Sequence, residues 1–372
     1  MLLYFNSIHL YSYINFNAFI KVPPIELDVS SFFLTHESIL SLKKTHQPLQ
    51  AQEIVPVLLP NIYLCPMRNL SLFFICILSN ILTQAQDTTV MVGSKIITLS
   101  NVVINNKLNI QGFIEKIKKD TSFYKAFKNL RTIGFTATND IRMLGKNDVV
   151  AASLFSHTVQ LITNNCRTMQ TVDEISTGNM YAVDSSYNYY TASMYASLFF
   201  TKGIICGETN IVKDKSFTTD GKKGMEKHKE QLKMLFFNPG KRINGLPFIS
   251  NKTAIYDDDI ADSYDIEIDW QPYNNRNCNV FKQKVKPGKQ GTVVVDEMTT
   301  WFDDKTDEVV ARNYTLSYSA GVYDFKVTMD IQMTTFGNLT VPYIIKYNGD
   351  WKALFKAREK GIFTAILSNF KL

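Results

Sequence analysis

A stretch near the C-terminal end of the chain alternates strictly between apolar and polar residues, from Tyr323 to Thr334. Its apolar positions are Tyr323, Phe325, Val327, Met329, Ile331 and Met333. Because successive side chains of a β-strand point to opposite faces, this period of two residues places all six on one face. The pattern predicts a half-buried antiparallel strand.

Similar alternation on both sides of this strand predicts a β-meander over residues 264–347. The expected strands cover residues 264–270, 278–285, 292–302, 310–318, 323–334 and 341–347. Short connections, such as the one at Pro287 and Gly288, separate them. Strands joined by such short turns are antiparallel neighbours. A terminal amphipathic helix is expected over residues 352–363.

The segment before the meander predicts helices as well as strands. Residues 90–104 are rich in Val and Ile and predict one or two short strands. Apolar residues recur at steps of three and four over residues 110–117 and 123–130, which predicts two amphipathic helices. Thr121 or Ser122 is positioned to cap the second helix. Lysines occupy the opposite helix faces, which suits either solvent or an anionic lipid surface.

Residues 131–212 are expected to be rich in β-structure. Aromatic and β-branched residues between polar turns predict strands at residues 133–137, 154–162, 180–183 and 187–200. Five tyrosines here either pack along a sheet or form a platform for stacking on sugars: Tyr181, Tyr187, Tyr189, Tyr190 and Tyr195. A further helix is predicted around Leu232, Leu235 and Phe236, ending at Asn238 to Gly240.

Residues 67–85 have the plan of a cleavable signal peptide. Arg68 supplies a positive start, residues 70–82 are almost wholly apolar, and Ala85 is a small residue at the expected cut. The apolar run is shorter than the roughly 20 residues that a membrane-spanning helix needs. Because a signal peptide works at the start of a chain, residues 1–66 are either an upstream extension from a misassigned start or a poorly ordered natural extension. The expected mature chain, residues 86–372, forms a single exported domain without a transmembrane helix.

Composition and charge exclude one class of partner. The chain has 372 residues, 45% of them hydrophobic, which is enough for one large core. Its net charge of +6, from 40 Lys and Arg against 34 Asp and Glu, is well below what a nucleic-acid-binding face concentrates. No nucleic-acid partner is therefore expected.

Three cysteines follow the expected cut, namely Cys166, Cys206 and Cys278. Export to an oxidising compartment permits a disulfide, and an odd number leaves one thiol over. Cys166 and Cys206 are the first pair to consider because both lie in the same part of the chain. Three buried free thiols are the alternative.

The meander contains a segment from Trp301 to Val309 in which one strand ends in aromatic residues, passes through an acidic turn and restarts with Val309. With the helices before it, this region resembles the lipoprotein-carrier family of the Gram-negative periplasm, of the LolA and LolB type. In that family a curved, incomplete barrel holds acyl chains under a helical lid. The resemblance implies an α+β fold, with a large antiparallel, half-barrel-like sheet and amphipathic helices packed on it.

The resemblance also implies an apolar groove. Methionine and aromatic side chains adapt to an irregular lipid, so the candidate groove residues are Trp301, Phe302, Phe325, Met329, Met333 and Tyr343. The same residues would serve equally well as an ordinary core packed against the helices. The pattern leaves both interpretations open.

Catalytic and metal-binding patterns are weak. His157 and His228 are the histidines of the expected mature chain, and neither belongs to a hydrolase or zinc motif. An acidic cluster at residues 257–265 lacks calcium-loop spacing, so a solvated loop competes with a calcium site there. Distant paired carboxylates for glycoside hydrolysis stay open. We expect no enzyme activity, cofactor or metal.

Two functions from different classes follow. The first is an envelope binding protein, in the periplasm or at the outer membrane or extracellular side of a Gram-negative-type envelope. It would hold a lipid, an acyl chain or a lipoprotein in the half-barrel groove, with peripheral membrane contact. The second is a secreted structural module that docks another envelope protein through an exposed edge strand and has no small-molecule ligand.

Overall fold

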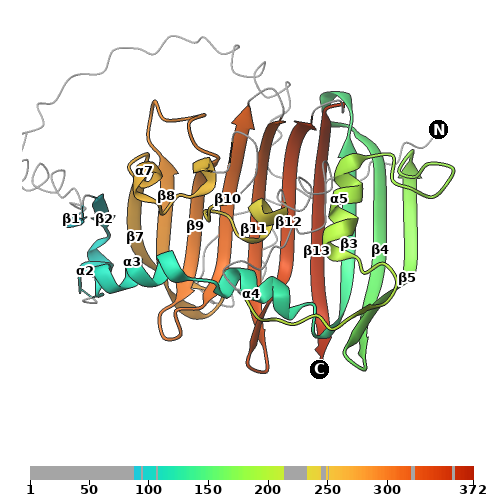
Figure 1. Cartoon of the computed structure of the whole chain (residues 1–372), viewed down its shortest axis with the longest axis horizontal. Coiled ribbons are helices and arrows are strands. Elements are labelled where there is room, and N and C mark those ends of the chain that lie inside the picture. Colours follow the sequence, from blue (N-terminus) through green and yellow to red (C-terminus); the bar gives the residue numbers. More distant parts are fainter. Residues whose placement is uncertain are drawn as a thin grey trace, which may run out of the picture. The chain divides into compact units, whose positions relative to one another are not determined.

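An open, curved sheet of 13 strands organises the part of the chain that the structure describes (Figure 1). The computed structural model describes residues 88–93, 95–105, 108–212, 233–243, 249, 251–319, 323–353 and 357–372. The upstream extension expected at residues 1–66 and the signal peptide expected at residues 67–85 lie outside the described residues. With helices packed on the sheet, the fold class is α+β, as predicted.

The strands run in the order β1-β2-β7-β8-β9-β10-β11-β12-β13-β3-β4-β5-β6 across the sheet. Their bounds are β1 Thr88–Val92, β2 Lys95–Leu99, β3 Gly134–Leu144, β4 Val150–Thr163, β5 Cys166–Gly178, β6 Ile205–Cys206, β7 Tyr264–Tyr273, β8 Arg276–Val285, β9 Val295–Asp303, β10 Val309–Ser319, β11 Tyr323–Phe336, β12 Leu339–Ala353 and β13 Glu359–Lys371. β11, the strand predicted from strict alternation, lies at the centre.

Strands β7 to β13 form one antiparallel meander, and earlier parts of the chain extend it at both sides. β3 pairs antiparallel with β13, and β4, β5 and β6 follow outward. At the other side β2 pairs with β7, and this pairing is parallel, with Ile97 opposite Ile266. The two sides of the sheet are therefore built from residues that precede the meander.

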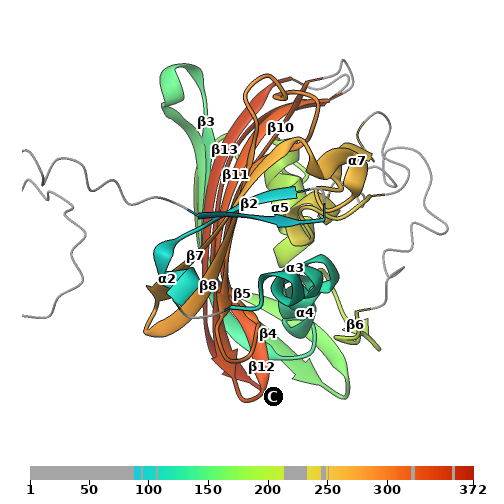
Figure 2. The ribbon, with the colours of Figure 1, turned by 90° about the vertical axis from the view of Figure 1, so that its left-hand side faces the viewer.

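Helices α3, α4 and α5 lie on the same face of the sheet, which curves around them (Figure 2). We call this the helix face and the opposite side the outer face. The helices are α2 Asn101–Asn105, α3 Ile110–Lys119, α4 Ser122–Asn129, α5 Tyr190–Phe199 and α7 Asp258–Ala261, with single 3-10 turns at Lys146–Asp148 and Asn251–Thr253. Residues 233–237 are also helical.

The central strand faces the helices with a continuous apolar row. Phe325, Val327, Met329, Ile331 and Met333 are all buried in the core. Burial of such side chains contributes about 1.5–3 kcal/mol each, so this row stabilises the contact between sheet and helices.

Polar contacts fix the helices on the sheet. The buried Arg312 guanidinium lies 3.7 Å from the Asp120 carboxylate, between α3 and α4. Asn129 donates a hydrogen bond to the carbonyl of Thr340 at 2.7 Å. The Tyr314 hydroxyl donates to the carbonyl of Phe236 at 2.5 Å. The positions of these helices are therefore set by specific partners as well as by burial.

Three predicted elements are wrong. Residues 180–183, expected as strand, form no regular strand, and Tyr181 makes only an isolated β-bridge. Residues 187–200, expected as strand, contain helix α5, and of this region only Tyr187 makes an isolated β-bridge, to Tyr181. Residues 352–363, expected as a helix, contain the end of β12 and the start of β13. In β13 both faces are apolar, because Phe363 and Ala365 are buried while Ile362 and Ile366 are exposed. That arrangement hides the period of two residues.

Smaller differences concern β5, α2 and the cap of α4. β5 was not expected, since most of its residues are polar or exposed. α2 follows β2 where only strands were expected. Thr121 is the N-cap residue of α4 without a side-chain hydrogen bond, and Asp120 instead accepts from the Ser122 backbone N–H at 2.9 Å.

Candidate functional site

Helix α5 is the element around which a candidate site is built. It carries no charged side chain and covers β13 and its neighbours on the helix face (Figure 1). Its residues are apolar on more than one side, with Ala192, Met194 and Tyr195 buried and Leu198 and Phe199 half-buried. A helix that is apolar nearly all round needs apolar neighbours beyond a single sheet face.

The N-terminus of α5 is held by β13. The Glu359 carboxylate accepts hydrogen bonds from the backbone N–H groups of Tyr190 at 2.9 Å and Thr191 at 2.7 Å, and from the Thr191 hydroxyl at 2.6 Å. Trp351 donates from Nε1 to the same hydroxyl at 2.9 Å. A carboxylate at this position satisfies otherwise unpaired N–H groups and favours the positive end of the helix dipole.

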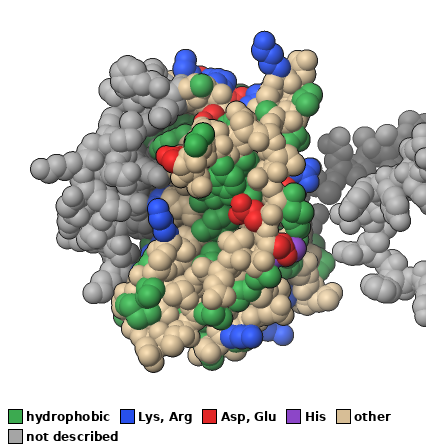
Figure 3. All heavy atoms as spheres, turned by 90° about the vertical axis from the view of Figure 1, so that its right-hand side faces the viewer, with side chains coloured by type: hydrophobic (Ala, Val, Ile, Leu, Met, Phe, Trp, Pro, Cys, Tyr) green, Lys and Arg blue, Asp and Glu red, His purple; other side chains and the backbone are tan. Residues whose placement is uncertain are grey.

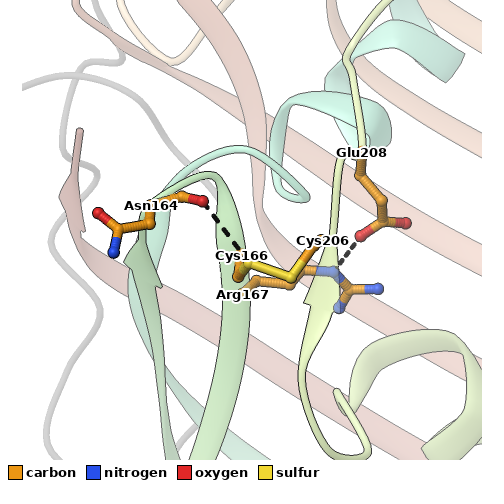
Figure 4. Close-up of a disulfide and its surroundings, with 5 residues drawn as sticks. All are labelled: Asn164, Cys166, Arg167, Cys206 and Glu208. Carbon is orange, nitrogen blue, oxygen red and sulfur yellow. Dashed lines mark hydrogen bonds and ion pairs between the residues drawn. A yellow bond between two sulfur atoms is a disulfide. The ribbon is translucent and has the colours of Figure 1, made fainter.

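The chain after α5 is held by β5. A disulfide joins Cys166 to Cys206, the pair considered first from the sequence (Figure 4). Next to it, Arg167 binds the Glu208 carboxylate and the Thr201 hydroxyl. Arg131 reaches the same carboxylate from the end of α4 at 3.3 Å. α5 is therefore tethered at both ends.

A pocket of about 120 Å³ lies beside the C-terminal half of α5, and we call it the α5 pocket. Five phenylalanines line it: Phe127, Phe135, Phe199, Phe200 and Phe237. Arg131 and Arg167 also line it, together with Lys128. The arrangement combines an apolar wall with a cationic side.

Two buried polar side chains that line the α5 pocket, Asn139 and Gln160, already have hydrogen-bond partners. Asn139 accepts a hydrogen bond from the Tyr195 hydroxyl at 3.1 Å and donates to Thr158 at 3.2 Å. Gln160 donates to two backbone carbonyls at 2.7 and 2.8 Å and accepts from Thr201 at 3.1 Å. These bonds fix the polar part of the wall, so the aromatic side chains are the adaptable part.

A second, much smaller pocket of about 10 Å³ adjoins the α5 pocket through shared lining residues, and we call it the Tyr347 pocket. Leu198 and Phe199 line both pockets, and we call this shared pair the partition. The Tyr347 ring stacks on Phe363, with ring centres 4.2 Å apart. Its hydroxyl is buried and has no hydrogen-bond partner among the described residues, and burial raises its pKa, so it stays protonated.

The structure does not bring the six candidate groove residues together. Met329 lines the Tyr347 pocket, while Phe302, Phe325 and Met333 are buried elsewhere on the helix face. Trp301 packs on Tyr273 on the outer face, with ring centres 5.1 Å apart. The Tyr343 hydroxyl donates to Gln332 at 2.8 Å on that face as well. Most of these residues are core, and a ligand-binding role for them stays a prediction.

Apart from Met329, the residues that line the two pockets were not among the predicted groove residues. Phe199 and Phe200 were assigned to a strand, so their position over β13 was not foreseen. Two adjacent phenylalanines before the polar pair Thr201-Lys202 were the available signal.

The tyrosines do not form one platform. Tyr195 is buried, Tyr190 packs on Trp351 at 5.6 Å, and Tyr181 pairs with Tyr187 at 5.0 Å.

The acidic and histidine side chains considered for metal binding or catalysis do not come together in one site among the described residues. Within the described ranges, no group of three or more His, Cys, Asp and Glu side chains is arranged to hold a metal ion. In the acidic cluster, Asp257 binds Arg242 and Asp258 lies 3.9 Å from Lys95. His157 contacts Asp173 at 2.7 Å on an exposed part of β4. His228 lies outside the described residues.

Cys278 is a buried free thiol, and burial raises its pKa to about 11.

Two further expectations concern membranes. The lysine-rich face of α3 is partly neutralised, because Lys116 binds Asp307 and Lys118 lies 3.4 Å from Glu115. None of the helices in the described part of the chain is long and apolar enough to cross a bilayer.

Comparison with known proteins gives distant structural similarity alone. No protein-family model and no curated protein matches the chain. A crystal structure described as an outer membrane lipoprotein-sorting protein domain from Vibrio parahaemolyticus is 8% identical, with a TM-score of 0.25, covering 69% of this chain and 91% of its own. A DUF1329 family protein from Desulfovibrio piger is 11% identical, with a TM-score of 0.21, covering 68% of this chain and 93% of its own. Similarity this low transfers no ligand, partner or activity.

Proposed function

We propose that the chain is an exported binding protein of a Gram-negative-type envelope, which holds a lipid or acyl chain beneath α5 without catalysis. The observation that carries this proposal is an uncharged helix, tethered at both ends, lying over two pockets that share an apolar partition. Ligand pockets are typically apolar with a few polar groups that fix orientation.

The partition explains how a long ligand fits. A cavity of about 150 Å³ lined by apolar side chains accommodates one benzene, so the α5 pocket at about 120 Å³ accepts only the end of a chain as it stands. Rotation of Leu198 and Phe199 would join it to the Tyr347 pocket. The combined space would then follow β12 and β13 beneath the helix.

Charge favours an amphiphile with an anionic head. Arg131 and Arg167 share the single carboxylate of Glu208, so this group of three carries a net positive charge. A carboxylate or phosphate at the rim would gain charge-assisted hydrogen bonds from the guanidinium groups. The acyl tail would then point toward the phenylalanines.

Two features support export. The signal peptide predicted at residues 67–85 would direct the chain across a membrane. The Cys166–Cys206 disulfide is typical of an oxidising compartment. Sequencing the N-terminus of the protein recovered from the envelope tests the predicted signal peptide, since a mature start upstream of Met67 would contradict it.

Binding of dodecanoate tests the proposal that the protein holds an acyl chain. Isothermal titration of the delipidated protein is expected to show saturable binding, and native mass spectrometry of freshly purified protein to show bound lipid. Leu198→Trp fills the partition and is expected to weaken binding about tenfold or more, because overpacking blocks the joined space. Val172→Trp adds the same ring on exposed β5 and should bind normally.

Unchanged dodecanoate affinity in Leu198→Trp, or no saturable binding by the unmodified protein, would contradict a site beneath α5.

A second candidate function has its own observation. β5 pairs with β6 only at Cys166 and Arg167, so among the described residues its remaining length has one unpaired edge. Val172 and Ile175 on this strand are each 66% exposed, and hydrophobic side chains are exposed on this side of the molecule (Figure 3). Such an edge suits β-strand addition by an extended segment of an envelope protein.

A photo-crosslinking residue at position 172 tests the docking function. It should capture one defined envelope protein in cells, while the same residue at Glu297, on β9, should not. Equal, diffuse labelling at both positions would argue against docking at β5.

A further inference from the structure

A third pocket lies near the other edge of the sheet, where β2 pairs with β7, and we call it the β8 pocket. Its volume is about 190 Å³, and it is bounded by β2, β7, β8 and α3. It shares no lining residue with the α5 pocket. Binding in the β8 pocket is therefore independent of the proposed lipid site.

The walls of the β8 pocket are apolar and partly aromatic. Ile97, Ile114, Ile266 and Phe281 line it and are buried. The Tyr256 ring also lines it, and burial raises the pKa of this phenol to about 12. Aromatic side chains favour offset or edge contacts with another ring.

Gln283, which lines the β8 pocket, has one unsatisfied polar atom. Its side chain comes from β8, lines the pocket and is only 1% exposed. The amide oxygen is buried and has no hydrogen-bond partner among the described residues. A buried acceptor left unpaired is costly, so a ligand that donates a hydrogen bond there would gain affinity.

The charged groups that line the pocket are already paired. Lys95 lies 3.9 Å from Asp258, and Lys118 lies 3.4 Å from Glu115. Burial and the positive charge of Lys118 lower the pKa of Lys95, while Asp258 opposes this effect. Two cations and two anions line the pocket, so the site does not require a charged ligand.

We propose that the β8 pocket binds an uncharged, ring-sized aromatic molecule that carries one hydrogen-bond donor, such as a phenol, with its hydroxyl directed at Gln283. The size agrees, because a cavity of about 150 Å³ holds benzene and this pocket is somewhat larger. The donor requirement comes from Gln283 and the ring requirement from Phe281 and Tyr256.

Ligand-observed NMR titration with three probes of similar shape tests the proposal on the unmodified protein. 4-Methylphenol is expected to bind about tenfold more tightly than toluene, which lacks the donor, or 4-methylanisole, in which the donor is methylated. Equal affinity for all three, which would mean that water satisfies Gln283, overturns the proposal. So does absence of saturable binding.

Two variants locate the site. Gln283→Met keeps the length of the side chain but removes the acceptor, so the preference for 4-methylphenol over toluene should disappear. Ile266→Phe fills the pocket and should abolish binding of both probes. Ile96→Phe is the matched control, because Ile96 is exposed on β2. This variant should bind both probes as the unmodified protein does.

Each variant is first compared with the unmodified protein by circular dichroism. If a folded Ile266→Phe variant binds 4-methylphenol normally, the phenol occupies another place and the assignment to the β8 pocket fails. Dodecanoate binding in that variant should be unchanged. Loss of one binding activity without the other separates this proposal from the lipid site beneath α5.

Discussion

Tyr347 occupies the space that a side chain at position 349 would fill. A Cβ atom built on Gly349 would lie 2.0 Å from the Tyr347 hydroxyl oxygen, closer than any real contact. Gly361 lies directly opposite Gly349 on β13, and a Cβ there would meet its neighbours at ordinary distances, 3.4 Å or more. The two glycines are paired in the sheet, but only Gly361 has space for a Cβ atom.

Gly349→Ala is therefore expected to destabilise the fold by about 1–3 kcal/mol, since the stacked Tyr347 ring must move. Urea unfolding followed by circular dichroism measures the change. Gly361→Ala is the control and should cost clearly less. Equal losses in the two variants would mean that the Tyr347 ring adapts freely.

Cys278 makes the stability depend on pH in a defined window. The pKa of its thiol rises from 9.0 to about 11 in the folded chain because the group is buried. Between these values the unfolded chain binds fewer protons than the folded chain. The contribution of the protonated thiol is fully present below pH 9 and is lost as the pH rises toward 11.

Cys278→Ala should accordingly lose less stability than the unmodified protein between pH 9 and pH 10.5. Urea midpoints at several pH values measure the difference, and the buried tyrosines that also titrate at high pH are common to both proteins. Parallel pH profiles would show that the thiol does not contribute.

Single residues were predicted well where one face is apolar and the other polar. The row from Phe325 to Met333 was placed on one buried face, and the structure buries it. Periodicity does not say what covers that face, so Met329 at a pocket and Phe325 in the core look alike in the sequence. Gln283 was not found, because an unpaired amide oxygen is a property of its surroundings.

Among the elements, α5 shows the limit of residue preferences. Its aromatic residues, Tyr190, Tyr195 and Phe199, are common in strands, and its weak polar side does not reveal a helical period. The partner that fixes its N-terminus, Glu359, is far away in the sequence. Tertiary contacts therefore decide the conformation of this segment.

Glu359→Ala should loosen the first turn of α5, because three hydrogen bonds are lost. The expected cost is about 1–2 kcal/mol, similar to the removal of a helix cap. Hydrogen exchange measured by mass spectrometry should become faster in residues 190–195, while β8 is unaffected. Glu297→Ala, at an exposed position on β9, is the control. Unchanged exchange in α5 would contradict the anchoring role.

For the whole molecule, the meander and the α+β class were predictable, since alternation and short turns act locally. The strands that extend the meander at its two edges were not predictable. Nothing in the residues of β2 or β3 identifies β7 or β13 as their neighbours, because such pairings depend on the whole sheet. The disulfide was predictable as a pair but not as a tether of α5.

The Cys166–Cys206 disulfide closes a loop with a sequence separation of 40. Replacing both cysteines by serine should lower stability by roughly 4 kcal/mol according to the chain-entropy account of cross-links. Urea unfolding with and without reductant measures the loss. Reductant should not change the stability of the double variant, whereas it should lower the stability of the unmodified protein. Equal stability of oxidised and reduced protein would contradict this expectation.

The pairing of β3 with β13 also bears on how the protein is made. Gly361 pairs with Met143, so β3, β4 and β5 leave the ribosome long before the strand that completes their sheet. Contacts between such distant residues form slowly, whereas β7 to β13 pair with immediate neighbours. Until β13 arrives, the apolar helix face of β3 and β4 has no sheet to join. Synthesis of this chain therefore favours a chaperone that shields β3, β4 and β5 until β13 is in place.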